Sequence, residues 1–358
     1  MNLLMFNLAV DDKHVTLAFG LRWIEALAAR YEHIDVITMT TGHHQLPSNV
    51  TVWSVGRERG YPEWLRALRF YWLVWRVMRQ RHIDVVFTHM IPVFAVMFWP
   101  VARLTGLKNV LWYAHGATPR MLKLAHWLVD RVVSSTPQGF RLPSDKVSFI
   151  GQGIDAGRYQ TASRISDSNP QFHILTVGRL APSKGLDLLV STLAGWRPET
   201  DWRLTVVGDG TSGSEHRYAQ GLRHKTQEAL GPSRITFTGR LDPVAIVPLL
   251  GKADVFINLS STGSLDKAMV EAMACGCPVM SSNDAFRAIA IAEGFPECAI
   301  EHSSQSLRVM LDRLFGMSAC ERQALGARQA EIARRDHTLN GLIQRLHDIL
   351  AANARVRG

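Results

Sequence analysis

Short apolar runs typical of β-strands alternate with segments of helical periodicity along almost the whole chain, and this alternation constrains the fold more than any other feature of the sequence. Parallel strands need a crossover connection, which is usually a helix, so the alternation predicts α/β units with helices on both faces of a parallel sheet. In the first half we expect strands at residues 3–9, 34–38, 51–55, 85–88, 110–113, 131–135 and 147–150.

The alternation is interrupted at residues 161–170 (TASRISDSNP), which are rich in Ser, Asp and Pro and predict a linker. Expected strands resume at residues 173–177, 203–207, 235–238, 255–259 and 278–281. A chain of 358 residues is too long for one ordinary core. We therefore predict two Rossmann-like, doubly wound α/β domains, residues 1–165 and 166–338, followed by a last helix that starts at residue 339.

The formal net charge of +9 favours anionic partners such as nucleotide phosphates, lipid headgroups or nucleic acid. No nucleic-acid-binding motif accompanies the charge, so nucleic acid is not an expected partner. The four cysteines show no zinc-ligand spacing and indicate reduced thiols in a cytoplasmic protein. The N-terminus predicts a strand rather than a signal peptide, and no apolar run reaches the roughly 20 residues that cross a bilayer, so we expect a soluble or peripheral protein.

Candidate ligand-binding residues follow the expected strands of the second half. Arg179 and Lys184 lie on the loop that begins at Gly178, and a guanidinium fork beside a compact ammonium suits a diphosphate. A solvated loop with two exposed charges explains them equally well. Gly208 belongs to a Gly-Asp-Gly turn that allows close approach of a ligand or a neighbouring loop, with a plain tight turn as the alternative. The loop at residues 239–241 suits a flat base, or is a generic strand end.

The most informative segment, residues 258–279, contains an expected strand end, a Ser/Thr/Gly loop and a helix. We expect the helix to start near Leu265 with Ser264 as its N-cap, and to end at Gly276. The N–H groups of its first turn predict an anion site, and Glu271 is placed to accept hydrogen bonds from a ribose diol. The alternative is a capped amphipathic helix with a surface glutamate.

As a set, these motifs resemble those of the retaining glycosyltransferases of family 4, whose GT-B fold has two Rossmann-like domains that face each other across a cleft. The matching segments are Val177-Gly-Arg-Leu with Lys184-Gly, Val207-Gly-Asp-Gly, Phe237-Thr-Gly-Arg, Glu271-Ala-Met-Ala-Cys-Gly-Cys-Pro-Val, Ile150-Gly-Gln-Gly-Ile-Asp and His115-Gly. The likeness covers nearly the whole chain and is strongest from about residue 147 to 282. We expect the C-terminal helix, about residues 339–358, to pack back on the first domain.

The resemblance implies roles for the matched positions. Arg179 and Lys184 would bind the donor diphosphate, and Glu271 would hold the ribose. His115 would contact the donor sugar from the other domain, or is a loop histidine without a ligand. Further implied donor contacts are Gly178, Gly208, Gly239, Arg240, Leu241, Gly263, Ser264, Leu265 and Lys267. Neither a metal nor another cofactor is expected, because two cations and a helix N-terminus neutralise the leaving diphosphate.

Two departures from the family pattern concern the sugars. The acidic pair of the family has seven residues between its members, and the position of the first acid is Gly263 here. Asp266 is a candidate replacement, and a helix N-terminal aspartate that accepts backbone N–H groups is the alternative. The first strand-to-helix loop carries Asp11, Asp12 and His14 where the family often has glycines. These three are candidate acceptor contacts, with an ordinary solvated loop as the alternative.

Residues 61–81 (YPEWLRALRFYWLVWRVMRQR) combine aromatic and basic side chains at helical spacing. Such helices can lie in a membrane interface, and anionic lipid is therefore a candidate partner. The alternative is a crossover helix whose aromatic side chains pack on the sheet while the arginines face water.

From these observations we expect retaining transfer of a sugar from a UDP- or GDP-sugar to a hydroxyl of a saccharide or lipid-linked saccharide. The expected setting is cell-envelope polysaccharide or glycan biosynthesis on the cytoplasmic side of the membrane. A nucleotide-sugar epimerase of the same fold would need a further acid/base set, which the sequence does not identify. A catalytically silent nucleotide-sugar-binding protein is the third hypothesis, because Gly263 lacks the family's acid.

Overall fold

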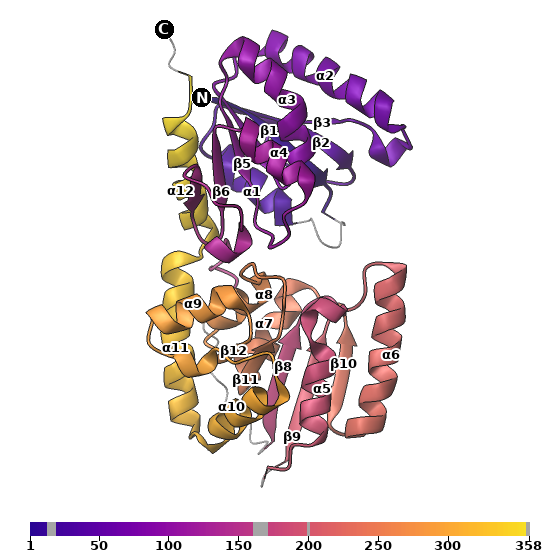
Figure 1. The fold of residues 1–358 in the computed structure, drawn as a ribbon, viewed down its shortest axis with the longest axis vertical. Coiled ribbons are helices and arrows are strands. Elements are labelled where there is room, and N and C mark those ends of the chain that lie inside the picture. Colours follow the sequence, from indigo (N-terminus) through magenta and orange to yellow (C-terminus); the bar gives the residue numbers. More distant parts are fainter. Residues whose placement is uncertain (13–18, 160–170, 199–200, 356–358) are drawn as a thin grey trace. The chain divides into compact units, whose positions relative to one another are not determined.

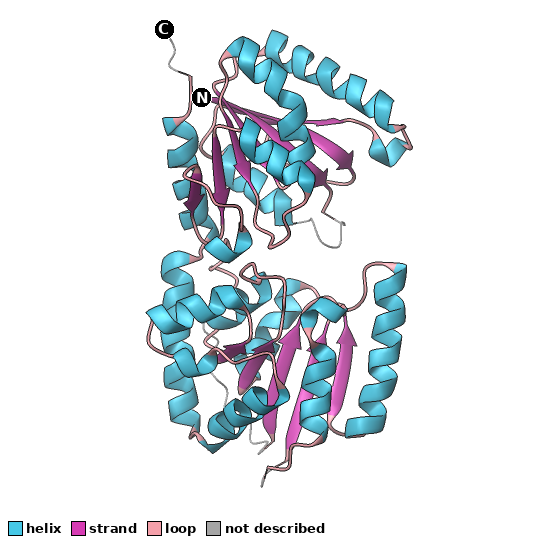
Figure 2. Cartoon of the chain, in the orientation of Figure 1, coloured by secondary structure: helices cyan, strands magenta, loops and turns pink. Residues whose placement is uncertain are grey.

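Each of the two units of the protein is built around its own parallel β-sheet (Figure 1, Figure 2). The structure, a computed structural model, describes residues 1–12, 19–159, 171–198 and 201–355. One unit comprises Met1–Gly151 with Leu339–Gly358, and the other comprises Gln152–Thr338. The first unit thus ends at Gly151, before the boundary expected at residue 165. That residue and the expected linker at 161–170 lie outside the described residues.

The first unit has a seven-stranded sheet in the order β3-β2-β1-β4-β5-β6-β7, and every pair is parallel. Its strands are β1 (Asn2–Val10), β2 (His33–Thr41), β3 (Val50–Ser54), β4 (Val85–His89), β5 (Asn109–Trp112), β6 (Arg131–Ser134) and β7 (Val147–Phe149). These are the seven expected strands. In β1, Leu3 and Leu4 belong to the cores on opposite faces of the sheet, and both are fully buried.

Helices cover both faces of this sheet. Helices α1 (Phe19–Ala28) and α12 (Leu339–Ala352) pack on one face. Helices α2 (Glu63–Gln80), α3 (Pro92–Thr105) and α4 (Arg120–Leu128) pack on the other. The buried side chains of α12 are Leu342, Ile343, Leu346 and Leu350. Because they form one apolar stripe that completes the core with α1, the last helix belongs to the first unit.

The second unit has a five-stranded parallel sheet in the order β10-β9-β8-β11-β12. Its strands are β8 (Phe172–Val177), β9 (Trp202–Val207), β10 (Ile235–Gly239), β11 (Val255–Asn258) and β12 (Val279–Ser281). Its helices are α5 (Leu186–Ala194), α6 (Gly213–Leu230), α7 (Pro243–Lys252), α8 (Lys267–Ala274), α9 (Asp284–Ala292), α10 (Ser304–Gly316) and α11 (Ala319–Asp336).

The strand order of the second sheet fixes where a ligand can bind. Strand β8 lies between β9 and β11, so successive connections leave β8 in opposite directions across the sheet. Ligands of doubly wound sheets bind at such a switch point, beyond the carboxyl ends of the strands. The loops that follow β8 and β11 meet there, and they carry Arg179, Lys184 and Asp266.

Two further observations concern thiols and membranes. The four cysteines are free thiols, of which Cys275, Cys277 and Cys298 are buried and Cys320 is exposed. Within the described ranges, no helix is both long enough and apolar enough to cross a membrane.

Candidate active site

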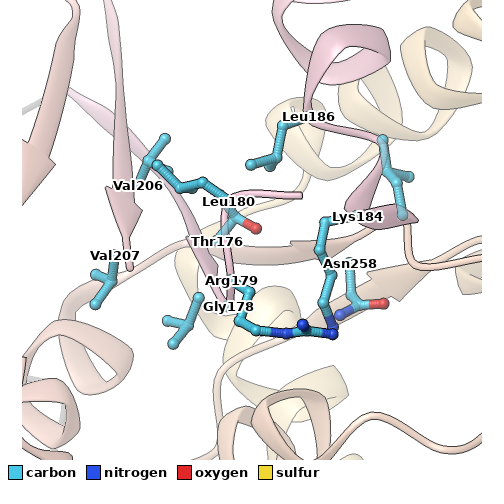
Figure 3. A pocket seen from close by; sticks show the side chains of 11 residues that line it. Thr176, Gly178, Arg179, Leu180, Lys184, Leu186, Val206, Val207 and Asn258 are labelled. Carbon is cyan, nitrogen blue, oxygen red and sulfur yellow. The ribbon is translucent and has the colours of Figure 1, made fainter. Parts of the chain in front are cut away.

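A pocket opens at the switch point of the second sheet (Figure 3). Its lining comes from β8, β9 and β11, from the loops after β8 and β11, and from the start of α5: Thr176, Val177, Gly178, Arg179, Leu180, Lys184, Leu186, Val206, Val207, Asn258 and Leu259. Figure 3 shows the ends of the Arg179 and Lys184 side chains beside the Asn258 amide. The two cations expected to bind a diphosphate therefore line one pocket.

The glycines at the carboxyl ends of three adjacent strands pack against one another. The N–H of Gly208 donates to the carbonyl of Gly239 at 2.8 Å. The N–H of Gly178 donates to the carbonyl of Val207 at 3.0 Å. A Cβ at Gly208, where φ is +133°, would lie 1.9 Å from the carbonyl oxygen of Gly178. The close approach that requires Gly208 is thus to a neighbouring loop, one of the two possibilities left open by the sequence.

The Arg179 guanidinium is held by a carboxylate at the start of α6. It donates to Glu215 Oε1 at 2.9 Å, and the Arg179 side chain remains 45% exposed. Glu215 also accepts from the Thr211 N–H at 2.8 Å and from the Thr211 hydroxyl. These hydrogen bonds, together with the Arg179 charge, outweigh burial and lower the pKa of Glu215. The guanidinium is therefore fixed in direction but keeps a solvent-facing side.

Lys184 and Asp266 form a shielded ion pair. Lys184 ends a short 3₁₀ turn, Pro182–Lys184, and its ammonium donates to Asp266 Oδ2, with side-chain exposures of 15% and 13%. The Asn258 amide donates to the same oxygen at 3.0 Å. Burial opposes ionisation of Asp266, but the Lys184 charge and the hydrogen bonds outweigh it, so the pKa of Asp266 is lowered. Asp266 is thus an ionised carboxylate that neutralises one of the pocket cations.

The start of α8 differs from the expectation. The helix begins at Lys267 rather than near Leu265, and its N-cap is Asp266, not Ser264. Asp266 Oδ1 accepts from the Ala268 N–H at 3.3 Å, so the aspartate itself occupies part of the expected anion site. Ser264 is instead drawn into the loop, where its carbonyl accepts from the Asn283 amide at 3.1 Å. At the other end, Gly276 is left-handed with a φ of +74°, which confirms it as the stop signal.

Glu271 lies one turn into α8 and is largely buried, with a side-chain exposure of 12%. It accepts a hydrogen bond from the Tyr159 hydroxyl, and the Lys267 ammonium lies 3.7 Å away. Burial raises the pKa of Glu271, while the Lys267 charge and the Tyr159 hydrogen bond partly offset that rise. Tyr159 could not be predicted from the sequence, because no motif connects it to a residue more than a hundred positions later.

Further candidates of the second unit lie on the loops that follow β10 and β11. Arg240 is exposed and Leu241 is half-buried, directly after β10. Gly263 is left-handed with a φ of +78°, so the position where the family has an acid here requires a glycine backbone. Buried Leu265 accepts from the Gln152 amide at 3.2 Å through its carbonyl.

The candidates of the first unit follow β1 and β5. His115 is exposed, and its Nδ1 accepts from the Ala117 N–H at 3.1 Å, so the neutral ring carries its proton on Nε2 and can donate outward. Asp12 is bound to the His43 ring at 2.7 Å, and Asp11 is half-buried. His14 lies outside the described residues. Across the part of the chain that the structure describes, no cluster of three or more His, Cys, Asp or Glu is arranged to hold a metal ion.

Residues 171–311 match the family model described as "Glycosyl transferases group 1". The matched segment contains the whole lining of the pocket, the Lys184–Asp266 pair and Glu271. A curated relative, D-inositol 3-phosphate glycosyltransferase of Rhodococcus jostii, is 25% identical over 60% of this chain and 52% of its own length. The chain thus spans about half the length of the curated relatives it matches.

Solved structures extend the likeness to both units. Sucrose-phosphate synthase from Thermosynechococcus elongatus has a TM-score of 0.79 at 15% identity, with 98% of both chains covered. The Anabaena protein HepE in complex with UDP has a TM-score of 0.77 at 18% identity, with 98% of this chain and all of that chain covered. At such identities the likeness is one of fold. Together with the two parallel sheets, it confirms the GT-B fold class of two Rossmann-like domains.

Proposed function

We propose that the protein is a retaining glycosyltransferase of family 4 that transfers a sugar from a UDP- or GDP-sugar to an acceptor hydroxyl. The observation that carries this proposal is that Arg179 and Lys184 line the same pocket. The pocket lies at the switch point of the second sheet, within the segment that matches the group 1 glycosyl transferases. Glu271, on the helix that follows the next loop, supplies a carboxylate for the ribose. HepE, a structural neighbour, was solved with UDP.

The proposed reaction needs no covalent enzyme intermediate. The bond between the anomeric carbon and the diphosphate oxygen breaks, the acceptor oxygen bonds to that carbon on the same face, and a donor phosphate oxygen takes the acceptor proton. Negative charge develops on the leaving diphosphate, which positive groups in a preorganised pocket stabilise. Arg179 would use its solvent-facing side for a phosphate, while Lys184 would act from its shielded position. We expect no metal requirement.

The two cations are predicted to contribute unequally. Arg179→Ala removes an exposed guanidinium and should weaken the donor complex and turnover, by about 10²-fold in kcat/KM. Lys184→Ala also leaves the buried Asp266 carboxylate without its counter-ion beside the diphosphate, so its loss should be larger, about 10³-fold, with reduced stability. Steady-state kinetics and thermal unfolding measure both effects. Full activity in both folded variants would refute the diphosphate assignment.

Asp266→Asn separates a structural role from a contact with the sugar. Asn is also a good N-cap, so α8 should persist, and Lys184 should become more available to the diphosphate. We expect donor affinity to be unchanged or increased if Asp266 serves Lys184 and the helix. A large loss of turnover with normal folding would instead favour contact with the sugar hydroxyls.

The proposed acceptor is a saccharide or lipid-linked saccharide of cell-envelope polysaccharide or glycan biosynthesis on the cytoplasmic side. A panel of UDP- and GDP-sugars in thermal-shift measurements identifies the donor, and nucleotide release with saccharide acceptors tests transfer. The anomeric configuration of the product, determined by NMR, tests retention. Conversion of the donor to its epimer would support the epimerase hypothesis. Binding without either reaction would support a silent binding protein.

A further inference from the structure

An aromatic stripe runs along the exposed side of α2 (Glu63–Gln80), the helix at the upper right of Figure 1. The large apolar side chains of this helix that remain between 41% and 65% exposed are Trp64, Leu68, Tyr71, Trp72 and Trp75. At about 100° of rotation per residue, these positions fall within roughly 100° of the helix circumference. The side chains therefore form one continuous stripe rather than scattered apolar residues.

The stripe is not the side of α2 that supports the fold. The residues buried against the sheet are Phe70, Leu73, Val74 and Val77, on the opposite side of the helix. The alternative in which the aromatic side chains of residues 61–81 pack on the sheet is thus wrong for Trp64, Tyr71, Trp72 and Trp75. Burial of Phe70 and its neighbours explains why the helix folds, but it leaves the exposed tryptophans without a structural role.

Positive charge borders the stripe. The Arg76 guanidinium lies 5.2 Å from the Trp72 ring centroid and 4.9 Å from that of Trp53. The Arg79 guanidinium lies 5.4 Å from the ring centroid of Trp75. These cation–π contacts hold the charges beside the aromatic rings. Basic and aromatic groups therefore share one surface.

The neighbouring helices continue this chemistry. Helices α3 and α4 cover the same face of the sheet as α2. On α4, Trp127 is 73% exposed, and Met121 and Leu124 are also exposed. The sequences of the three helices contain seven arginines and lysines and a single acid, Glu63. Such a surface repels a second copy of itself and complements an anionic one.

We propose that the outer side of α2 binds an anionic lipid bilayer, with its aromatic stripe at the level of the headgroups. Tryptophan suits this region because its ring is apolar and its N–H is polar. The arginines would meet headgroup phosphates, and the helix would lie in the plane of the interface. This surface lies in the first unit and its binding requires no donor, so it is independent of the proposed glycosyl transfer.

Vesicle sedimentation with the full chain tests the proposal. We expect binding to vesicles of phosphatidylcholine with about 30% phosphatidylglycerol, which gives a strongly anionic surface. Binding to pure phosphatidylcholine should be weak, and binding to the anionic vesicles should weaken at high salt. Arg76→Gln with Arg79→Gln should lower the partition coefficient about fivefold for each arginine removed. Trp72→Ser with Trp75→Ser should lower it at least about tenfold.

A matched control is Val309→Ser, which alters a 65% exposed apolar residue on α10 of the second unit and should leave vesicle binding unchanged. Circular dichroism and thermal unfolding should show that all variants are folded. The proposal would be overturned if the wild type did not bind the anionic vesicles. It would also be overturned if both α2 double variants bound them as strongly as the wild type. Concentration-dependent association without lipid, abolished by the tryptophan variant, would show instead that the stripe covers another protein chain.

Discussion

At the scale of single residues, the Tyr159–Glu271 contact links the start of the second unit to helix α8. Tyr159 is 3% exposed, and its hydroxyl donates to a carboxylate whose pKa is raised by burial. A ribose diol needs the ionised form of Glu271 as its acceptor. If Glu271 holds the ribose as proposed, Tyr159 would be a positioning residue, because it would act on the donor through Glu271.

Tyr159→Phe should therefore change the pH dependence of donor binding. Because the pKa of Glu271 is raised, we expect donor affinity to fall on acidification at a higher pH than an ordinary glutamate would give. The Tyr159 hydrogen bond lowers that pKa, so its removal should shift the acid limb further toward neutral pH. At about pH 8, well above the acid limb, the loss of donor affinity should be only about two- to tenfold. Calorimetric titration of the nucleotide across pH measures the shift.

The matched control for this prediction is Tyr218→Phe. The Tyr218 hydroxyl donates to Asp187 at 2.6 Å, so this variant also removes a tyrosine–carboxylate hydrogen bond in the second unit. We expect its acid limb to coincide with that of the wild type. Coincident limbs for Tyr159→Phe and wild type would show that the Tyr159 hydroxyl has no influence on Glu271 ionisation.

At the scale of elements, Asn283 joins the start of α9 to the loop between β11 and α8. Its Oδ1 accepts from the N–H groups of Ala285 and Phe286 at 2.9 and 3.2 Å, and its amide donates to the Ser264 carbonyl at 3.1 Å. The residue is fully buried. One side chain thus caps a helix and fixes the loop that ends in Asp266. An asparagine directly before a helical segment is an N-cap pattern, so the capping role of Asn283 can be predicted from the sequence.

Asn283→Ala should lose both interactions at once. We expect the free energy of unfolding to fall by about 2–4 kcal/mol, from the lost cap and the unsatisfied buried groups. Donor affinity should fall as well, because the loop before α8 loses its tether. Ser303→Ala, which removes the N-cap of α10, is the control: it should cost about 1 kcal/mol without changing donor affinity. Equal donor affinity in both variants would exclude a role for the tether.

At the scale of the whole molecule, the chain returns to its first unit at the end. Helix α12 fills the core beside α1 with Leu342, Ile343 and Leu346, each at most 1% exposed. The first unit is therefore complete only when α12 has been made. The second unit, Gln152–Thr338, has its own core and contains the pocket.

Deletion of residues 339–358 should destabilise the first unit selectively. Uncovering the buried leucines and isoleucine of α12 removes about 1.5–3 kcal/mol of stability for each side chain. Their summed loss approaches the free energy of unfolding of a typical domain. Calorimetry should show an early transition for the first unit, and limited proteolysis should leave a fragment close to residues 152–338. Leu346→Ala, with an expected loss of about 2–5 kcal/mol, is the milder companion variant. A single unchanged transition would contradict the division into units.

Local sequence patterns determined the strands, the two sheets and the loops that carry the site. The alternation of apolar runs, the glycines after β8, β9 and β10, and the stop at Gly276 all act over a few neighbouring residues, so they can be read from the chain itself. Even there, the N-cap is Asp266 rather than Ser264, and the same carboxylate pairs with Lys184, 82 residues earlier. Local propensity leaves such a choice open.

Only the tertiary structure decided which distant side chains meet and which face water. It paired Arg179 with Glu215, Lys184 with Asp266 and Tyr159 with Glu271. It also turned the tryptophans of α2 outward, although their helical spacing fits a buried face as well as an exposed one. The physical reason is that ion pairing and burial depend on packing between segments far apart in the chain, and periodicity within one segment carries no information about its neighbours in space.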